Sequence, residues 1–245
     1  MLQGNILAID LAKSSFQAHL ASSQGRVLVR KKLSRSALAD FVSTADAEVI
    51  AMEACAGANF WGRLFEVFGK QVRLMAPQYV KPFVKTNKND ANDAEAIAEA
   101  ASRPTMRFVP LKTVGQQDIS SLHCIRSRLV SQRTALTNQT RGLLAEYGVV
   151  VPQGHAKLRA RLLELQQEDS FRGDLTAFML RKLAELAGEL TELDTRIKQC
   201  DLEVKELCDK DELSAELTKI VGIGPLTATA LRAASGNMEQ FKNGR

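Results

Sequence analysis

Cysteine and histidine are scarce in this chain of 245 residues, and long apolar runs are missing. The four cysteines form no C-x-x-C pair and the three histidines stand apart, a spacing that argues against a zinc finger. The scattered cysteines also give no support for a cysteine nucleophile. No apolar run approaches the roughly 20 residues that cross a membrane, and the N-terminus lacks a secretory signal. We therefore expect a cytoplasmic protein that does not bind membranes.

The chain is basic overall, but its charge is unevenly distributed. Lys and Arg number 33 against 28 Asp and Glu, a net charge of +5. Residues 112–161 carry 8 basic and 2 acidic side chains, whereas residues 162–216 carry 7 and 15. Because basic surfaces attract phosphate, we expect nucleic-acid contacts at the two ends of the chain and after residue 111, and not in the acidic block.

The N-terminal part alternates between strand and helix patterns. Five segments have the short apolar run or the alternation of a strand: 5–10, 16–20, 27–33, 48–53 and 71–76. Three segments have helical spacing: 34–44, 58–68 and 90–102. The order β-β-β-α-β-α-β-α is typical of a ribonuclease H-like α/β domain, although other α/β layers share it.

Beyond residue 111 the chain is predicted to be helical. Apolar residues alternate in steps of four and three at Met179, Leu183, Leu186, Leu190, Leu193, Ile197, Cys200, Val204 and Leu207. This is the a/d seam of a helix that packs along its length. The partner is either a helix within the same bundle, giving a long packed helix or a coiled coil, or a helix of a second copy, so a homo-oligomer is one expectation.

The last segment reads as helix, Gly-Ile-Gly turn, helix. Gly222 and Gly224 permit a tight turn whose backbone amides, with the start of the next helix, can approach a phosphate. An ordinary turn between helices would have the same sequence pattern, but we favour a helix-hairpin-helix contact with DNA. The predicted organisation is α/β plus all-α: a nuclease-type domain over 1–111, a helical region over 112–215 and the hairpin over 216–245.

Four carboxylates are placed by the predicted elements where they can meet. Asp10 and Glu53 end two apolar strands, and Asp90 and Asp93 open a helix at a spacing that puts both on one face. Each alone has a simpler explanation: a core acid paired with a base such as Lys13, a strand-end charge, or a helix cap. Together they predict a catalytic site holding Mg²⁺ or Mn²⁺, whose preferred ligands are carboxylate oxygens, for reaction at a DNA phosphate.

Basic residues near these acids and in the following helix are candidate nucleic-acid ligands. Lys81, Lys85 and Lys88 lie in the loop before the Asp90 helix, and Arg126 and Arg133 lie in the basic segment after residue 111. Loop lysines are more often simply solvated. Their position beside the predicted metal site favours contacts with the DNA backbone.

The motifs around the four acids resemble one known family. They are Ala-Ile-Asp-Leu-Ala-Lys at 8–13, Met-Glu-Ala-Cys-Ala-Gly at 52–57 and Lys-Thr-Asn-Lys-Asn-Asp-Ala-Asn-Asp-Ala at 85–94. The chain resembles the DEDD transposases of the insertion-sequence-110 family, which are related to the pilin gene inverting recombinase. The resemblance implies a RuvC-like domain whose four acids bind metal, a coiled-coil middle, and a C-terminal domain opening on Gly-Ile-Gly-Pro. It also implies DNA and a noncoding guide RNA as partners.

The sequence departs from the family pattern in two places. Asn87 stands where family members usually have Asp. The family's C-terminal domain also contains a serine thought to attack DNA, and no equivalent is present before Arg245, because Ser235 precedes the expected region. We therefore expect a truncated form, a frameshifted copy or a fragment of the element.

Three other functions compete with the transposase. A non-catalytic nucleic-acid-binding remnant fits the missing serine, and a resolvase-type structure-specific nuclease would use the same acids with water. The long seam and the terminal hairpin argue against the resolvase. An actin-like or sugar-kinase ATPase is disfavoured because Leu11, and not glycine, follows Asp10.

Overall fold

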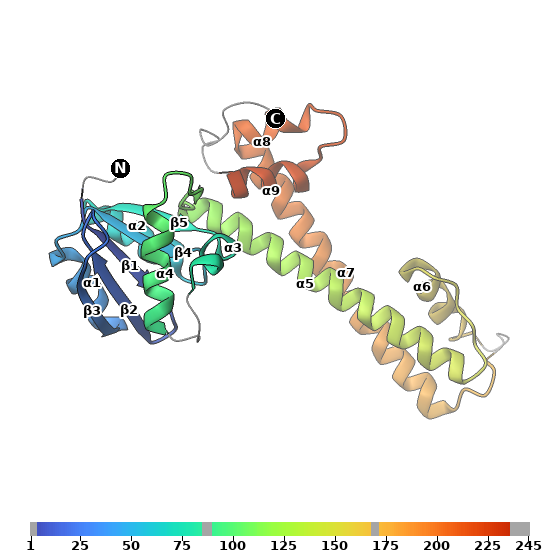
Figure 1. The fold of residues 1–245 in the computed structure, drawn as a ribbon. Helices are drawn as coiled ribbons and strands as arrows, with labels where there is room; N and C mark the ends of the chain where they lie inside the picture. Colours follow the sequence, from blue (N-terminus) through green and yellow to red (C-terminus); the bar gives the residue numbers. More distant parts are fainter. Residues whose placement is uncertain (1–3, 85–89, 168–171, 236–245) are drawn as a thin grey trace. The chain divides into compact units, whose positions relative to one another are not determined.

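A computed structural model of the chain describes residues 4–84, 90–167 and 172–235, with only the backbone described at Asp90 and Ala91. The chain forms two compact units, made chiefly of Met1–Val114 and of Gly115–Ala234. The first unit is a mixed sheet with helices, and the second is helical (Figure 1). An α/β part followed by a helical part agrees with the fold class predicted from the sequence.

The first unit is built on a six-stranded sheet in the order β3-β2-β1-β4-β5-β6. The strands are β1 (Ile6–Asp10), β2 (Ser15–Ala21), β3 (Val27–Ser34), β4 (Val49–Glu53), β5 (Gln71–Met75) and β6 (Phe108–Val109). The strands β1, β4 and β5 run parallel, whereas β2, β3 and β6 pair antiparallel with their neighbours. All five predicted strands are therefore confirmed, and β6 is an addition.

The residues of β1 alternate between two hydrophobic cores, one on each face of the sheet. Leu7 and Ile9 pack in the core with α1 (Arg35–Thr44) and α2 (Ala58–Val67). Ile6 and Ala8 pack on the other face, in the core that contains the apolar side of α4 (Asp90–Ser102). Figure 1 shows α4 lying along this second face. Because side chains alternate along a strand, the odd or even position of a residue decides which helix it faces.

Local sequence signals set where these helices begin. The Ser34 hydroxyl accepts a hydrogen bond from the Ala37 backbone N–H and so caps α1. Two short elements that the sequence pattern does not predict precede α4: α3 (Pro77–Val80) and the 3₁₀ turn η1 (Lys81–Phe83). Each has a proline in its first turn, Pro77 in α3 and Pro82 in η1, where the missing backbone N–H costs no helical hydrogen bond.

The second unit is organised by two long helices, α5 (Val114–Glu146) and α7 (Ala177–Lys210), which lie side by side (Figure 1). Leu129 of α5 packs with Ile197 and Cys200 of α7, and Leu136 lies in one core with Leu190. The later residue of α5, Leu136, packs with the earlier residue of α7, Leu190, so the two helices are antiparallel. The predicted seam of α7 thus packs against a helix of the same chain. None of the described helices is long and apolar enough to span a membrane.

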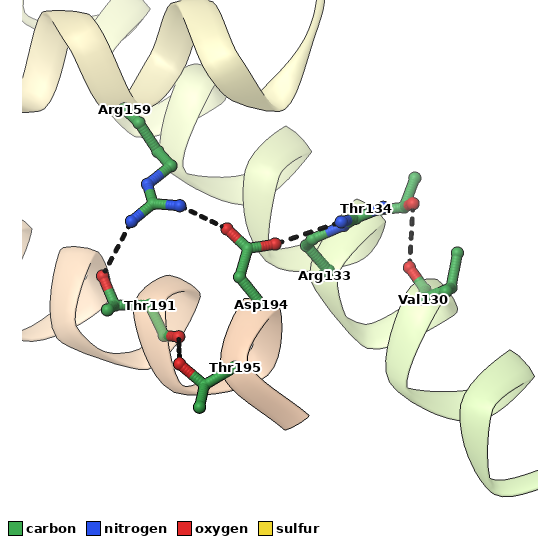
Figure 2. A network of polar contacts seen from close by, with 7 residues as sticks. All are labelled: Val130, Arg133, Thr134, Arg159, Thr191, Asp194 and Thr195. Atoms are coloured by element: carbon green, nitrogen blue, oxygen red, sulfur yellow. Dashed lines mark hydrogen bonds and ion pairs between the residues drawn. The ribbon is translucent and has the colours of Figure 1, made fainter. Parts of the chain in front are cut away.

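One aspartate of α7 joins three helices (Figure 2). Asp194 accepts hydrogen bonds from Arg133 Nη1 of α5 at 3.0 Å and from Arg159 Nη1 of α6 (His155–Glu164) at 2.6 Å. Arg159 Nη2 also lies 3.5 Å from the hydroxyl of Thr191, one turn earlier on α7. The two arginines thus connect α5 and α6 to α7 through one carboxylate.

The helices α8 (Glu212–Thr218) and α9 (Pro225–Ser235) end the described chain. The Asp211 carboxylate caps α8 by accepting from the Ser214 backbone N–H. Between the helices, Gly222 has a φ of 92°, a left-handed conformation that favours glycine. The predicted helix, glycine turn, helix arrangement is present, and His123 of α5 bonds Thr229 of α9 at 3.0 Å.

Candidate active site

Asp10 and Glu53 end two neighbouring parallel strands at the same level of the sheet. Alignment of β1 with β4 runs from Ile6 opposite Val49 to Ile9 opposite Met52, and each acid is the next residue of its strand. Both side chains are half-buried. Because strands in a sheet lie about 4.8 Å apart, the two carboxylates are neighbours.

Both acids belong to the face of the sheet that α4 covers. Ala8 and Ala51, two positions before Asp10 and Glu53, lie in the α4 core, whereas Ile9 and Met52 lie in the opposite core. Alternation along each strand therefore places both carboxylates on the α4 side. Met75, which aligns with Glu53 on β5, is buried on the same side.

The thiol of Cys55 reports on both carboxylates. Burial raises the pKa of Cys55, and the negative charges of Glu53 and then Asp10 raise it further. The Cys55 Sγ also lies 3.9 Å from the Leu11 carbonyl oxygen, so the loop after β4 contacts the loop after β1. A raised pKa favours the protonated form of the Cys55 thiol. Its position beside the acids is not evident from the sequence, where its one signal is that it follows a strand-end carboxylate.

Asp93 lies in the first turns of α4, the helix that covers these acids. It is half-buried and stands four residues before Ile97, which is fully buried against the sheet. Residues four apart lie on one side of a helix, so Asp93 is on the sheet-facing side. Asp90 begins α4, and its side chain lies outside the described residues. Within 4–84, 90–167 and 172–235, no group of three or more His, Cys, Asp or Glu side chains is close enough to hold a metal ion.

The structure describes one of the three candidate lysines. Lys81 is exposed at the start of η1, in the segment that leads from β5 to α4. Lys85 and Lys88 lie outside the described residues, as does Asn87. The proximity of these lysines to the acids therefore stays a prediction.

Arg126 and Arg133 both face carboxylates of α7. Arg126 Nε donates to Asp201 at 2.6 Å, and Arg133 donates to Asp194. Each of the two side chains is 23% exposed, so both are largely shielded from solvent. The structure gives both arginines a role in holding α5 to α7, and their contact with nucleic acid stays a prediction.

Gly222 and Gly224 lie in an exposed turn between α8 and α9. A Cβ added at either position would meet no atom within 4 Å, so close packing inside the chain is not what requires glycine there. Val221 between the helices is fully exposed. This geometry leaves the backbone of the turn accessible to a ligand, as the predicted phosphate contact requires.

Comparison with known proteins identifies the family. Residues 7–149 match the family model of the DEDD transposases of the IS110 type, described as "Transposase". A probable family 20 transposase of Pseudomonas aeruginosa is 42% identical over 98% of this chain and 70% of its own length. The transposase of IS1328 from Yersinia enterocolitica is 40% identical over the same shares, and that of IS1111A from Coxiella burnetii is 41% identical over 98% and 65%. The chain therefore belongs to the IS110-type DEDD transposase family, as the motifs around its acids suggested.

Proposed function

We propose that Asp10, Glu53, Asp90 and Asp93 form a divalent-metal centre that carries out phosphoryl transfer on DNA during transposition of an insertion sequence. The observation that carries this proposal is the position of Asp10 and Glu53 on adjacent parallel strands, at one level and on one face of the sheet. Two neighbouring carboxylates on one face can together provide oxygen ligands to one divalent cation.

The donor set fits Mg²⁺ or Mn²⁺. Carboxylate oxygens are the ligands that these hard cations prefer. The negative charges of Glu53 and Asp10 raise the pKa of the Cys55 thiol, as two acids at one place should. Asp93 lies on the sheet-facing side of α4, and the spacing of Asp90 and Asp93 favours a shared face. Asp10, Glu53 and Asp93 are all described and do not come close enough together to form a group of three donors, so a complete site depends on Asp90, whose side chain lies outside the described residues.

Bound divalent metal would supply charge stabilisation at a phosphate and activation of an attacking oxygen. The chain's own contribution is to hold the two carboxylates at the ends of two central strands, on the face of the sheet that α4 covers. Lys81, with Lys85 and Lys88, would bind phosphates of the strand beside the centre. Arg126 and Arg133 would bind nucleic acid only through N–H groups that their ion pairs with α7 do not use.

We also propose the finer assignments of fold. A sheet with three antiparallel strands followed by parallel β4 and β5 supports a ribonuclease H-like, RuvC-like domain over 1–111. The helix pair over 112–215 is its scaffold. The accessible turn at Gly222 and Gly224 supports a helix-hairpin-helix contact with DNA over 216–245.

A guide RNA and a homo-oligomer are further parts of the proposal. The resemblance to the family is the basis for the RNA partner, which predicts that RNA purifies with the full chain and is released by ribonuclease. The apolar seam of α7 is occupied by α5, so an oligomer would have to use other surfaces. Light scattering of the purified chain, before and after ribonuclease treatment, tests both.

A plasmid-nicking assay tests the proposed function. The full chain should nick supercoiled DNA with Mg²⁺ or Mn²⁺, and a metal chelator should abolish nicking. Asp10→Asn and Glu53→Gln should reduce the nicking rate by at least a hundredfold while DNA binding persists. The control is Asp40→Asn, because Asp40 is an exposed acid on α1. Equal rates for Asp10→Asn and Asp40→Asn would refute the centre. DNA binding without nicking by the unaltered chain would favour the non-catalytic remnant.

A further inference from the structure

A row of polar side chains runs across the sheet from the proposed centre to its edge. Asp10 aligns with Gln17 of β2, and Gln17 aligns with Lys32 of β3. Directly opposite residues in a sheet project to the same face. Glu53, Asp10, Gln17 and Lys32 therefore form one row on the face that carries α4.

The neighbouring row confirms which face this is. Ala8 aligns with His19 and His19 with Arg30, one level below Asp10. The Arg30 guanidinium forms an ion pair with Glu95 of α4, so side chains at this alternation of β3 do reach the α4 side. Lys32 stands two positions after Arg30 and has the same orientation.

Lys32 is available for a ligand, whereas its neighbours are engaged. It is exposed on β3, the edge strand of the sheet, and among the described residues no carboxylate forms an ion pair with it. Lys31 points to the opposite face, where its ammonium lies 5.5 Å from the centre of the Phe41 ring. Gln17 is half-buried between Asp10 and Lys32. Next to the two acids, the row thus contains a hydrogen-bond donor, Gln17, and a cation, Lys32.

We propose that Gln17 and Lys32 bind the sugar-phosphate backbone of the DNA strand that enters the Asp10–Glu53 centre. This inference rests on the proposed function. Strand spacing puts the Lys32 backbone roughly 10 Å from that of Asp10. Successive phosphates of a DNA strand are separated by more than the roughly 3.4 Å rise along the helix axis, so Lys32 reaches a phosphate near the reacting one. The Gln17 amide N–H groups are donors suited to a phosphate oxygen between them.

The chemistry selects a phosphate backbone over other ligands. The row offers a cation and an amide donor, groups that bind phosphate oxygens, so the contact is independent of DNA sequence. Its acidic end requires metal before a phosphate can approach, whereas its Lys32 end attracts phosphate without metal. Binding at Lys32 is therefore measurable in a chelator, when no cleavage occurs.

Fluorescence anisotropy of the full chain with labelled DNA oligonucleotides in chelator, over a series of salt concentrations, tests the proposal. Lys32→Gln should weaken binding about three- to tenfold at low salt and lower the slope of log affinity against log salt by about 0.7 to 0.9, the value of one lost phosphate contact. Lys32→Arg should restore the slope. Gln17→Leu should weaken binding about two- to threefold with the slope unchanged, because the amide is neutral. Lys31→Gln is the matched control and should bind as the unaltered chain does.

The same preparations, assayed for plasmid nicking with Mg²⁺, separate this inference from the proposed function. Equal slopes for Lys32→Gln and Lys31→Gln would overturn the inference even where nicking by the unaltered chain upholds the metal centre. A lower slope in Lys32→Gln, in a chain that never nicks DNA, would uphold the phosphate contact and refute the catalytic function.

Discussion

Asp10 and Glu53 lie side by side at the ends of two parallel strands, one position beyond the aligned pair Ile9 and Met52. Both are on the face of the sheet that α4 covers, and both raise the pKa of Cys55. Two positions earlier on the same face, β1 and β4 carry Ala8 and Ala51, which are apolar and fully buried. The two charges therefore lie at the carboxyl ends of these strands, where both side chains are partly exposed.

The reactivity of the Cys55 thiol tests whether it lies close to Glu53 and Asp10. Because Glu53 and Asp10 add to the effect of burial on the thiol, Glu53→Gln should lower the pKa of Cys55 and accelerate its alkylation by iodoacetamide. Asp10→Asn should have a smaller effect in the same direction. Mass spectrometry of peptides gives the rate, with the exposed Cys124 as internal reference. Asp40→Asn should leave the rate unchanged, and so would Glu53→Gln if the thiol and the acid were far apart.

His19 should make the first unit less stable in acid. Burial lowers the pKa of His19 and Arg30 lowers it further, while Glu95 raises it. In the unfolded chain His19 binds a proton near pH 6.5, whereas in the folded chain it does so only at lower pH. The contribution of neutral His19 to the free energy of unfolding is therefore fully present above about pH 6.5 and decreases as the pH falls below it. Urea unfolding followed by the fluorescence of Trp61, the one tryptophan, should show this loss between about pH 7 and pH 5. His19→Leu should flatten the pH dependence; an unchanged dependence would show that other groups cause it.

Asp194 should stabilise the second unit through its two arginines. Asp194→Ala leaves Arg133 and Arg159 without their shared partner at a site where the Asp194 side chain is only 21% exposed. We expect a loss of about 2 kcal/mol in the free energy of unfolding. Glu185→Ala, which removes the exposed ion pair with Lys182, should cost less than about 0.5 kcal/mol. Thermal unfolding followed by circular dichroism compares the two, and equal losses would contradict the network's role.

Leu129 should be a principal contact between α5 and α7. It is 1% exposed and packs against Ile197 and Cys200. Leu129→Ala should destabilise the second unit by about 2 to 4 kcal/mol, because it removes buried contacts and leaves a cavity. Ile125, one turn earlier, is 46% exposed, and Ile125→Ala should cost less than about 1 kcal/mol. Denaturant unfolding of both variants tests the contact, and similar midpoints would contradict it.

The sequence predicts the first unit's fold well because its strands and helices carry clear periodicity. In β1 the alternation of Leu7 and Ile9 with Ile6 and Ala8 fills two cores, which is why it reads as one continuous apolar run. β6 is not predictable in this way, since Phe108 and Val109 form a strand only by pairing with Leu74 and Met75. The seam of α7 predicts a packed helix, but the choice of α5 as its partner depends on tertiary contacts that no local pattern contains.

The candidate site is predictable from the sequence only in part. Asp10 and Glu53 can be expected to meet because each ends a strand, and parallel neighbours end at one edge. The partners of Arg126 and Arg133 cannot be predicted in this way, since Asp201 and Asp194 lie 75 and 61 residues further along the chain. The position of Lys32 in the row of Asp10 depends on the register of β1, β2 and β3, which an apolar pattern specifies less closely than it specifies the strands themselves.

Binding of Mn²⁺ tests the central claim most directly. Free Mn²⁺ can be followed by electron paramagnetic resonance as it is titrated into the full chain, without DNA and without reliance on cleavage. We expect the unaltered chain and Asp40→Asn to bind Mn²⁺ alike, and Asp10→Asn and Glu53→Gln each to bind at least about tenfold more weakly, because each loses a charged ligand. The same Mn²⁺ affinity in all four proteins would show that Asp10 and Glu53 do not hold a metal ion.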